Sequence, residues 1–270
     1  NFTLYDKEKN VITRDSQVID WEVSEAEKAG HDHFMYKEIL EQAEVIERTI
    51  AGRIEKNSTE IPIHLDKAKK FEKIWIVACG TAYHAGLFGK DLFEKVLGVP
   101  VSVELASEFR YREPIIGKND LAIVISQSGE TMDTIAATEL LKENGSHVLA
   151  LVNVVGSSLA RMADSVFYLH VGPEIGVAST KAYLGMLVGQ LLLAKHWDSN
   201  NKLDTSLEEI KALPSLIEEA LKCEDQVKQI SKLIYKKKDI YFIGRGLDYA
   251  LAAEGLSLIH ISEPTRLELI

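Results

Sequence analysis

Three hydroxyl side chains stand close together where an apolar segment changes into a helical one. Ser126, Ser128 and Thr131 follow the apolar run 121–125, and residues 130–141 have the composition of a helix. Free backbone N–H groups and the positive end of the helix dipole gather at such a helix start, and both favour a phosphate. Taken alone, the loop is explained more simply as a capped turn between a strand and a helix. The phosphate hypothesis gains weight because two other loops share its character.

The two other loops also place small or hydroxyl residues before a predicted helix. Residues 78–82 contain Gly80, which permits a close backbone approach, and Thr81, which offers a hydroxyl. Residues 174–180 precede a long apolar helix, and a simple Ser/Thr cap is the alternative interpretation there. None of the three loops has the spacing of a P-loop or of a dinucleotide-binding turn. Neutral donors at successive strand ends therefore suit a small phosphorylated sugar.

Three titratable residues near these loops have ordinary explanations. His84 lies one turn into a predicted helix, and we expect it at the surface or in the core rather than in catalysis. Glu130 and Asp133 lie in a first helical turn, where carboxylates complement the helix dipole. We interpret Glu130 as a capping residue.

Short apolar segments alternate with helical ones through the middle of the chain. The predicted strands are residues 74–78, 101–105, 121–125, 147–152 and 166–169. The predicted helices between them are residues 82–96, 131–144 and 157–162. This alternation predicts an α/β fold with a doubly wound parallel sheet flanked by helices, in which ligands bind at the carboxyl ends of the strands.

The flanking regions have their own patterns. Residues 1–20 indicate a strand, a turn and a strand, and a helical pattern runs over 33–54. After an apolar core helix at 182–194, we expect helices at 206–213, 214–223 and 225–235, with Pro214 in a first helical turn, and then a strand at 239–243. The segment 73–83 resembles 239–249 residue for residue in type, which suggests a duplicated strand–loop–helix unit.

Composition excludes several functions. The formal net charge of -10 argues against a nucleic-acid partner, because nothing offsets a phosphate backbone. Cys79 and Cys223 have no pairing signature and no metal-ligand spacing, so we expect a reducing, cytoplasmic environment and no bound metal. The longest apolar stretch is too short to cross a bilayer, so we expect no membrane association.

Several motifs, in this order and spacing, resemble a known family. They are ACGTAY (78–83), ELASEFRYR (104–112), SQSGETMDT (126–134), NVVGSSLAR (153–161) and EIGVASTKA (174–182). Together they are similar to the sugar isomerase (SIS) domain of the glutamine–fructose-6-phosphate aminotransferases. HFMYKEILEQ (33–42) resembles that family's interdomain linker, and GRGLDYALAAEG (244–255) resembles the start of its second SIS domain.

The resemblance implies a reaction and a set of binding residues. Enzymes of this family make glucosamine 6-phosphate from fructose 6-phosphate and glutamine, are dimeric, and need no cofactor. The implied phosphate-binding residues are Ser126, Gln127, Ser128 and Thr131. Thr81 with Cys79 and Gly80, and the backbone of Val177 and Ala178, would line the sugar. Position 82 is Ala where many members have Ser, which removes one hydroxyl from the phosphate site.

The resemblance also implies a division of the chain. Residues 1–30 would be the remnant of an upstream glutaminase domain, 31–64 the interdomain linker helix, 65–205 the first SIS domain, and 206–255 the beginning of a second. The family's isomerisation glutamate would fall at about Ile261, so we expect no catalytic residue and no turnover in this fragment. The string LSLIHISEPTR (256–266) matches a translated sequencing adapter, and we expect residues 256–270 to be a non-native tail.

Two alternatives to this interpretation are disfavoured by the segment before residue 65. A non-catalytic SIS sugar-phosphate sensor of a transcription regulator should carry a basic helix-turn-helix before residue 65. This chain has an acidic strand pair and the HFMYKEILEQ segment there instead. The same segment disfavours a stand-alone ketose–aldose isomerase.

Overall fold

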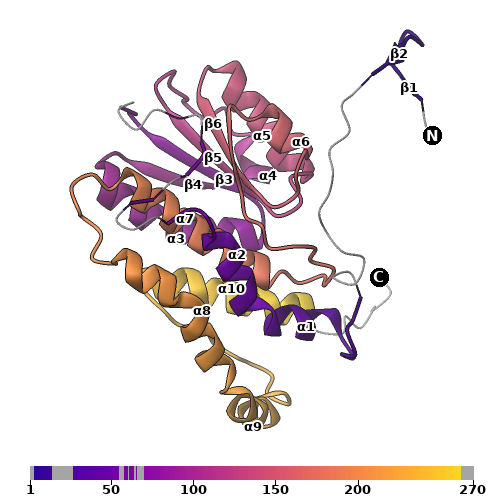
Figure 1. Ribbon diagram of the computed structural model, residues 1–270, viewed down its shortest axis with the longest axis vertical. Helices are drawn as coiled ribbons and strands as arrows, with labels where there is room; N and C mark the ends of the chain where they lie inside the picture. Colours follow the sequence, from indigo (N-terminus) through magenta and orange to yellow (C-terminus); the bar gives the residue numbers. More distant parts are fainter. Residues whose placement is uncertain are drawn as a thin grey trace.

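A five-stranded parallel sheet forms the centre of the computed structural model (Figure 1). The structure describes residues 3–13, 27–54, 58–59, 61–63, 65 and 70–262. The strands are β3 (Ile74–Ala78), β4 (Val101–Leu105), β5 (Leu121–Ser126), β6 (His147–Val152) and β7 (Ser165–Tyr168), in the spatial order β4-β3-β5-β6-β7. The predicted parallel sheet is confirmed, and the predicted strand bounds agree with the observed ones to within one residue.

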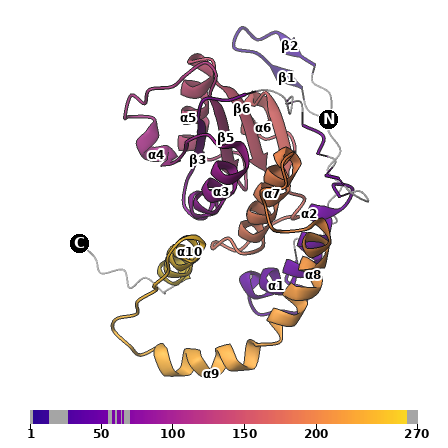
Figure 2. The same ribbon diagram turned by 90° about the vertical axis from the view of Figure 1, so that its left-hand side faces the viewer.

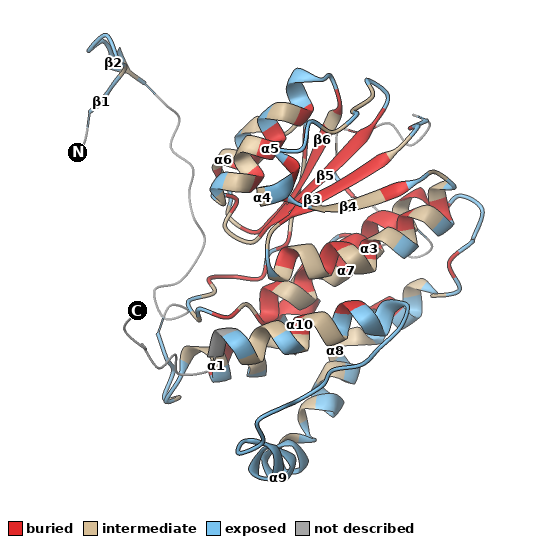
Figure 3. Cartoon of the chain, turned by 180° about the vertical axis from the view of Figure 1, so that it is seen from behind, coloured by how far each residue is buried: buried red, intermediate tan, exposed pale blue. Residues whose placement is uncertain are grey.

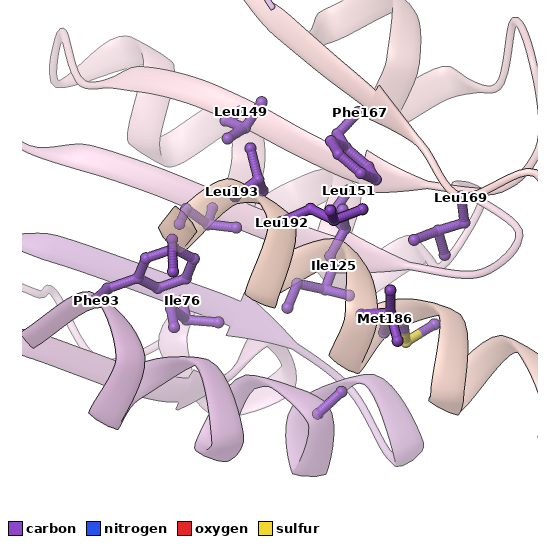
Figure 4. Close-up of a cluster of buried hydrophobic side chains, with 14 of the residues drawn as sticks. Ile76, Phe93, Ile125, Leu149, Leu151, Phe167, Leu169, Met186, Leu192 and Leu193 are labelled. Atoms are coloured by element: carbon purple, nitrogen blue, oxygen red, sulfur yellow. The ribbon is translucent and has the colours of Figure 1, made fainter. Parts of the chain in front are cut away.

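Side chains alternate between the two faces of the sheet and form two apolar cores. Ile76, Ile125 and Leu151 point toward α3 (Thr81–Leu97) and α7 (Lys181–Trp197), where they meet Phe93 and Met186 (Figure 4). The opposite face presents Trp75, Val77, Val124 and Ala150 to α4 (Ala106–Phe109), α5 (Met132–Glu143) and α6 (Ser158–Met162). Because helices cover both faces, the central strands β3, β5 and β6 are buried almost throughout, whereas the edge strand β4 is mostly half-buried (Figure 3).

The strand order reverses direction next to β3. From β3 the chain passes through α3 to β4 on one side, and it then returns through α4 to β5 on the other side. Ala78 and Ile125, the last paired residues of β3 and β5, are register partners. In open α/β sheets this switch point is where the loops diverge and leave a crevice for ligands. The loops after β3 and β5 are two of the three loops predicted from the sequence.

The segment before the sheet domain is a hairpin followed by two helices. β1 (Leu4–Tyr5) pairs antiparallel with β2 (Val11–Ile12), which confirms the predicted strand pair. The predicted helical region 33–54 is divided at Glu41 into α1 (Phe34–Leu40) and α2 (Gln42–Ile50). α2 packs against α7 and buries Val45 and Ile46 in the same core as the sheet.

Two predictions for the C-terminal part are wrong. Pro214 lies inside one continuous helix, α8 (Leu207–Leu221), instead of starting a new one. Ser206 and Glu209 form a capping box that starts α8, and the helix tolerates the one backbone hydrogen bond that a proline removes. Residues 239–243 form no strand, because no described strand lies beside them to complete a backbone ladder.

The last two described helices lie outside the sheet domain. α9 (Glu224–Ile234) has no buried residue and stands apart from the rest (Figure 2). α10 (Leu247–Ser262) packs against α3, and residues 256–262 of the predicted non-native tail continue it as helix. Residues 263–270 of that predicted tail lie outside the described residues, as do 14–26 of the predicted glutaminase remnant.

Candidate functional site

Hydrogen bonds within the chain shape the loop after β5. The Gly129 N–H donates to Ser126 Oγ over 3.0 Å, and Ser126 Oγ lies 3.1 Å from Thr131 Oγ1. The Glu130 N–H donates to Ser128 Oγ over 3.2 Å. Ser126 is buried, whereas Gln127, Ser128 and Thr131 are partly exposed. The predicted phosphate residues therefore share one tight turn at the start of α5, and three of the four lie at the protein surface.

The two carboxylates of this turn are already engaged by donors. Glu130 Oε1 accepts the Ser158 N–H over 2.7 Å, which caps α6 instead of the helix that follows Glu130. That hydrogen bond lowers the pKa of Glu130. Asp133 pairs with Arg110 at 2.8 Å. The expected capping role of Glu130 is thus confirmed, for a different helix, and neither carboxylate is left as an unpaired charge beside the loop.

The loop after β3 starts α3 and has open space beside its glycine. Gly80 has φ +55°, and a Cβ built there would meet no atom within 4 Å. Cys79 approaches the second loop, because Thr134 Oγ1 of α5 lies 4.0 Å from Cys79 Sγ. A left-handed glycine that borders free space allows a ligand to approach the backbone closely. Two of the three predicted loops therefore lie side by side at the switch point.

A carboxylate from α10 joins this region, and the sequence analysis did not identify it. Glu254 is buried, accepts the Thr81 hydroxyl proton over 2.8 Å, and lies 2.6 Å from His84 Nδ1. Burial, with the Glu254 charge in addition, raises the pKa of Tyr183 in the first turn of α7 to about 12. His84 thus has a specific partner across 170 residues of sequence. No local pattern could have indicated a contact over that separation.

The third loop is held by a carboxylate instead of a Ser/Thr cap. Glu174 accepts the backbone N–H groups of Thr180 and Ala182, at 2.8 and 3.1 Å, and the Ser179 hydroxyl at 2.7 Å. The side chain of Thr180, the N-cap of α7, makes no capping hydrogen bond. Of the two predicted sugar-lining residues in this loop, Val177 is 93% exposed and Ala178 is buried.

Within the residues that the structure describes, no group of three His, Cys, Asp or Glu side chains could hold a metal ion. Of the helices formed by those residues, none is both long and apolar enough to cross a bilayer.

Gly129 should be essential for the turn at residues 126–131, the candidate phosphate turn, because it has φ +63° and a Cβ there would lie 2.1 Å from the buried Ser157 Oγ. For Gly129→Ala, the left-handed conformation should lower the free energy of unfolding by about 1–2 kcal/mol. The clash should remove roughly a further 1–3 kcal/mol. Urea denaturation measures both terms together.

Gly52→Ala is the matched control for this experiment. Gly52 has φ +69° and no atom within 4 Å of a built Cβ, so its substitution reports the backbone cost without a clash. Equal losses of stability in the two variants would contradict the close packing of the loop against Ser157.

The Thr81–Glu254 hydrogen bond should contribute to stability through a buried acceptor. Thr81→Val keeps the shape of the side chain but removes the donor to Glu254 Oε1. We expect a loss of about 1–3 kcal/mol in the free energy of unfolding, because a buried carboxylate oxygen loses its partner. Thr81→Ser keeps the hydroxyl and serves as the control. The assignment fails if the two variants are equally stable.

Comparisons with known proteins agree with this geometry. The sequence profile of the SIS domain matches residues 67–195. A glutamine–fructose-6-phosphate aminotransferase [isomerizing] from Clostridium tetani is 47% identical over 270 residues, which cover 96% of this chain and 44% of that protein. One from Caldanaerobacter subterraneus is 48% identical over 255 residues, which cover 90% and 42%. The chain therefore spans less than half the length of these curated relatives.

This chain covers a larger share of one solved structure. The C-terminal domain of glucosamine-fructose-6-phosphate aminotransferase from Francisella tularensis superposes with a TM-score of 0.78 and 38% sequence identity, over 87% of this chain and 70% of that one. The chain thus belongs to the glutamine–fructose-6-phosphate aminotransferase family and carries the SIS domain of its isomerase region.

Proposed function

We propose that this chain is the sugar-phosphate-binding part of an enzyme that makes glucosamine 6-phosphate from fructose 6-phosphate and glutamine. One observation supports this proposal above the others: a turn of hydroxyl and amide donors stands at the switch point of the sheet, next to the loop after β3. The family relatives carry the name of that reaction. The region would hold the phosphosugar while the amino group is transferred and the ketose is converted to the aldose.

In this proposal the phosphate is bound by Ser126, Gln127, Ser128 and Thr131 with the backbone N–H groups at the start of α5. A monophosphate needs several donors at once, and a helix start supplies them with a favourable dipole. No lysine or arginine is present between residues 126 and 134, so neutral donors would carry the binding. The engagement of Glu130 and Asp133 by other donors reduces their repulsion of the anion.

The sugar would lie between the loop after β3 and the loop before α7. Cys79, Gly80 and Thr81 would contact it from one side, and the backbone of Val177 and Ala178 from the other. The open space beside Gly80 supports a close approach to that backbone. Ala82 is almost fully buried, so it offers the phosphate no hydroxyl and little surface.

The wider assignments also belong to this proposal. We propose a cytoplasmic enzyme that acts as a homodimer, with residues 206–255 as the beginning of a second SIS domain. Large apolar side chains of this part are exposed, and the rest of that domain would cover them; they include Leu233, Tyr235, Tyr241 and Ile243. The alternative of a sensor domain from a transcription regulator is not favoured, because the relatives at 38–48% identity are aminotransferases.

The phosphate turn can be tested by thermal unfolding with added sugar phosphate. Fructose 6-phosphate and glucose 6-phosphate should each raise the melting temperature, since a ligand at about 100 times its Kd stabilises a folded protein by roughly 2.7 kcal/mol. Ser128→Ala should shrink this shift. Ser231→Ala, on exposed α9, should leave it as it is. A shift that survives Ser128→Ala unchanged would remove the phosphate role of the loop.

Turnover is expected to be absent from this polypeptide. Proton transfer between adjacent sugar carbons needs a base within hydrogen-bond reach, and Ile261 occupies the position to which the resemblance assigns that glutamate. A product assay with fructose 6-phosphate and glutamine or ammonia should therefore give no glucosamine 6-phosphate above the blank without protein. A full-length relative serves as the positive control. Measured synthesis by this chain would refute the expectation.

A further inference from the structure

A carboxylate of α1 reaches into the loop that precedes α7. Glu38 is 2% exposed, and its Oε1 accepts the backbone N–H groups of Ile175, at 2.6 Å, and Gly176, at 3.0 Å. Gly176 N also lies 3.3 Å from Oε2. Two consecutive peptide groups therefore point at one buried carboxylate that is about 137 residues away in sequence. Hydrogen bonds to a charged acceptor are about twice as strong as neutral ones.

The contact lies immediately before the backbone assigned to the sugar. Glu38 holds residues 175 and 176, and Glu174 holds the N–H groups of Thr180 and Ala182. Val177 and Ala178 stand between these two attachments. Burial raises the pKa of Glu174, and the Glu38 charge adds to the effect, so the two carboxylates lie near each other. The loop between them has little freedom to change its path.

The packing at Gly176 shows how closely α1 approaches. A Cβ on Gly176 would lie 2.6 Å from Glu38 Oε2 and 3.5 Å from the backbone of Met35. Glycine at this position allows the helix to rest directly on the loop. The glycine is needed here for space, because its φ lies outside the left-handed region.

A salt bridge also joins the C-terminal end of α1 to the start of α7. Lys181 Nζ lies 2.6 Å from Glu41 Oε2, and Lys37 Nζ lies 3.3 Å from Glu41 Oε1. Lys181 is 2% exposed. Although burial opposes it, the two lysines lower the pKa of Glu41, so the carboxylate is ionised and paired at neutral pH. Helix α1 is thereby attached to both ends of the segment 175–181: Glu38 accepts from residues 175 and 176, and Glu41 at its C-terminal end pairs with Lys181.

We propose that Glu38 is a positioning residue that sets the path of the sugar-lining backbone at Val177 and Ala178. It acts through the loop and not on the ligand, and the inference rests on the proposed binding of a phosphosugar by this chain. A movement of α1 would then alter the affinity for the sugar and leave the structure of the phosphate turn after β5 unchanged. The segment that precedes the SIS domain is in this way connected to sugar affinity.

The test compares two ligands in three variants of the 270-residue chain. Glu38→Ala removes both acceptors, Glu38→Gln keeps one uncharged oxygen, and Glu44→Ala removes an exposed glutamate of α2 as the matched control. Calorimetric titration measures fructose 6-phosphate and inorganic phosphate. We expect Glu38→Ala to weaken fructose 6-phosphate about tenfold, which corresponds to the loss of one charged hydrogen bond, and Glu38→Gln to fall between it and the wild type. Inorganic phosphate should bind all variants alike.

Each other outcome has a definite meaning. Equal weakening of fructose 6-phosphate and inorganic phosphate would show a general loss of structure and overturn the positioning role. Unchanged fructose 6-phosphate binding in Glu38→Ala would overturn it directly. If the wild type binds neither ligand, the proposed function fails, and the positioning role is then decided without ligand by amide hydrogen exchange.

Hydrogen exchange also covers variants that fold poorly. In the apo protein, Glu38→Gln should speed exchange at Ile175 and Gly176, while the amides of β5 and β6 keep wild-type protection. Gly176→Ala perturbs the same contact from the loop side, because its Cβ displaces the carboxylate. It should reproduce both the faster exchange and the selective loss for fructose 6-phosphate. Wild-type exchange at residues 175–176 in both variants would refute the inference.

Discussion

The whole arrangement depends on how a buried parallel strand passes into a helix within a few residues. At the end of β5 the chain leaves a fully buried strand at Ser126 and begins α5 at Met132. The Ser126 hydroxyl closes the turn by accepting the Gly129 N–H, and the left-handed Gly129 lets the chain fit against Ser157. This turn presents hydroxyl and N–H donors at a helix start, beside the loop that ends β3.

The proposed anion site is compatible with a net charge of -10 because the nearby carboxylates serve as internal acceptors. Glu130 caps α6, and Glu174 accepts backbone N–H groups at the start of α7. Glu254 accepts a hydrogen bond from the Thr81 hydroxyl, and Glu38 accepts two backbone N–H groups of the third loop. Each carboxylate is directed at a donor of the scaffold. Acidic residues thereby fix the loops, and these four carboxylates are partnered instead of standing as bare charges beside the proposed phosphate site.

Local sequence patterns were sufficient to predict the sheet and the positions of the loops. They were insufficient to predict the long-range hydrogen bonds that fix the loops. Uniform apolar runs such as 121–125 predict buried strands because burial on both faces demands them. The prediction of a strand at 239–243 was wrong because a strand needs a neighbouring strand for its hydrogen bonds. The prediction of a helix break at Pro214 was wrong because the surrounding turns of α8 outweigh one lost hydrogen bond. Glu38 and Glu254 find partners more than 130 residues away, and no local spacing reports such contacts.

The central claim is that uncharged donors at a strand-to-helix turn bind a monophosphate. A crystal structure of this chain with fructose 6-phosphate tests it most directly. The claim predicts phosphate oxygens within hydrogen-bond distance of Ser128, Thr131 and the backbone N–H groups at the start of α5, with the sugar extending toward Thr81. A phosphate held instead by lysine or arginine side chains, away from the carboxyl ends of β3 and β5, would contradict it.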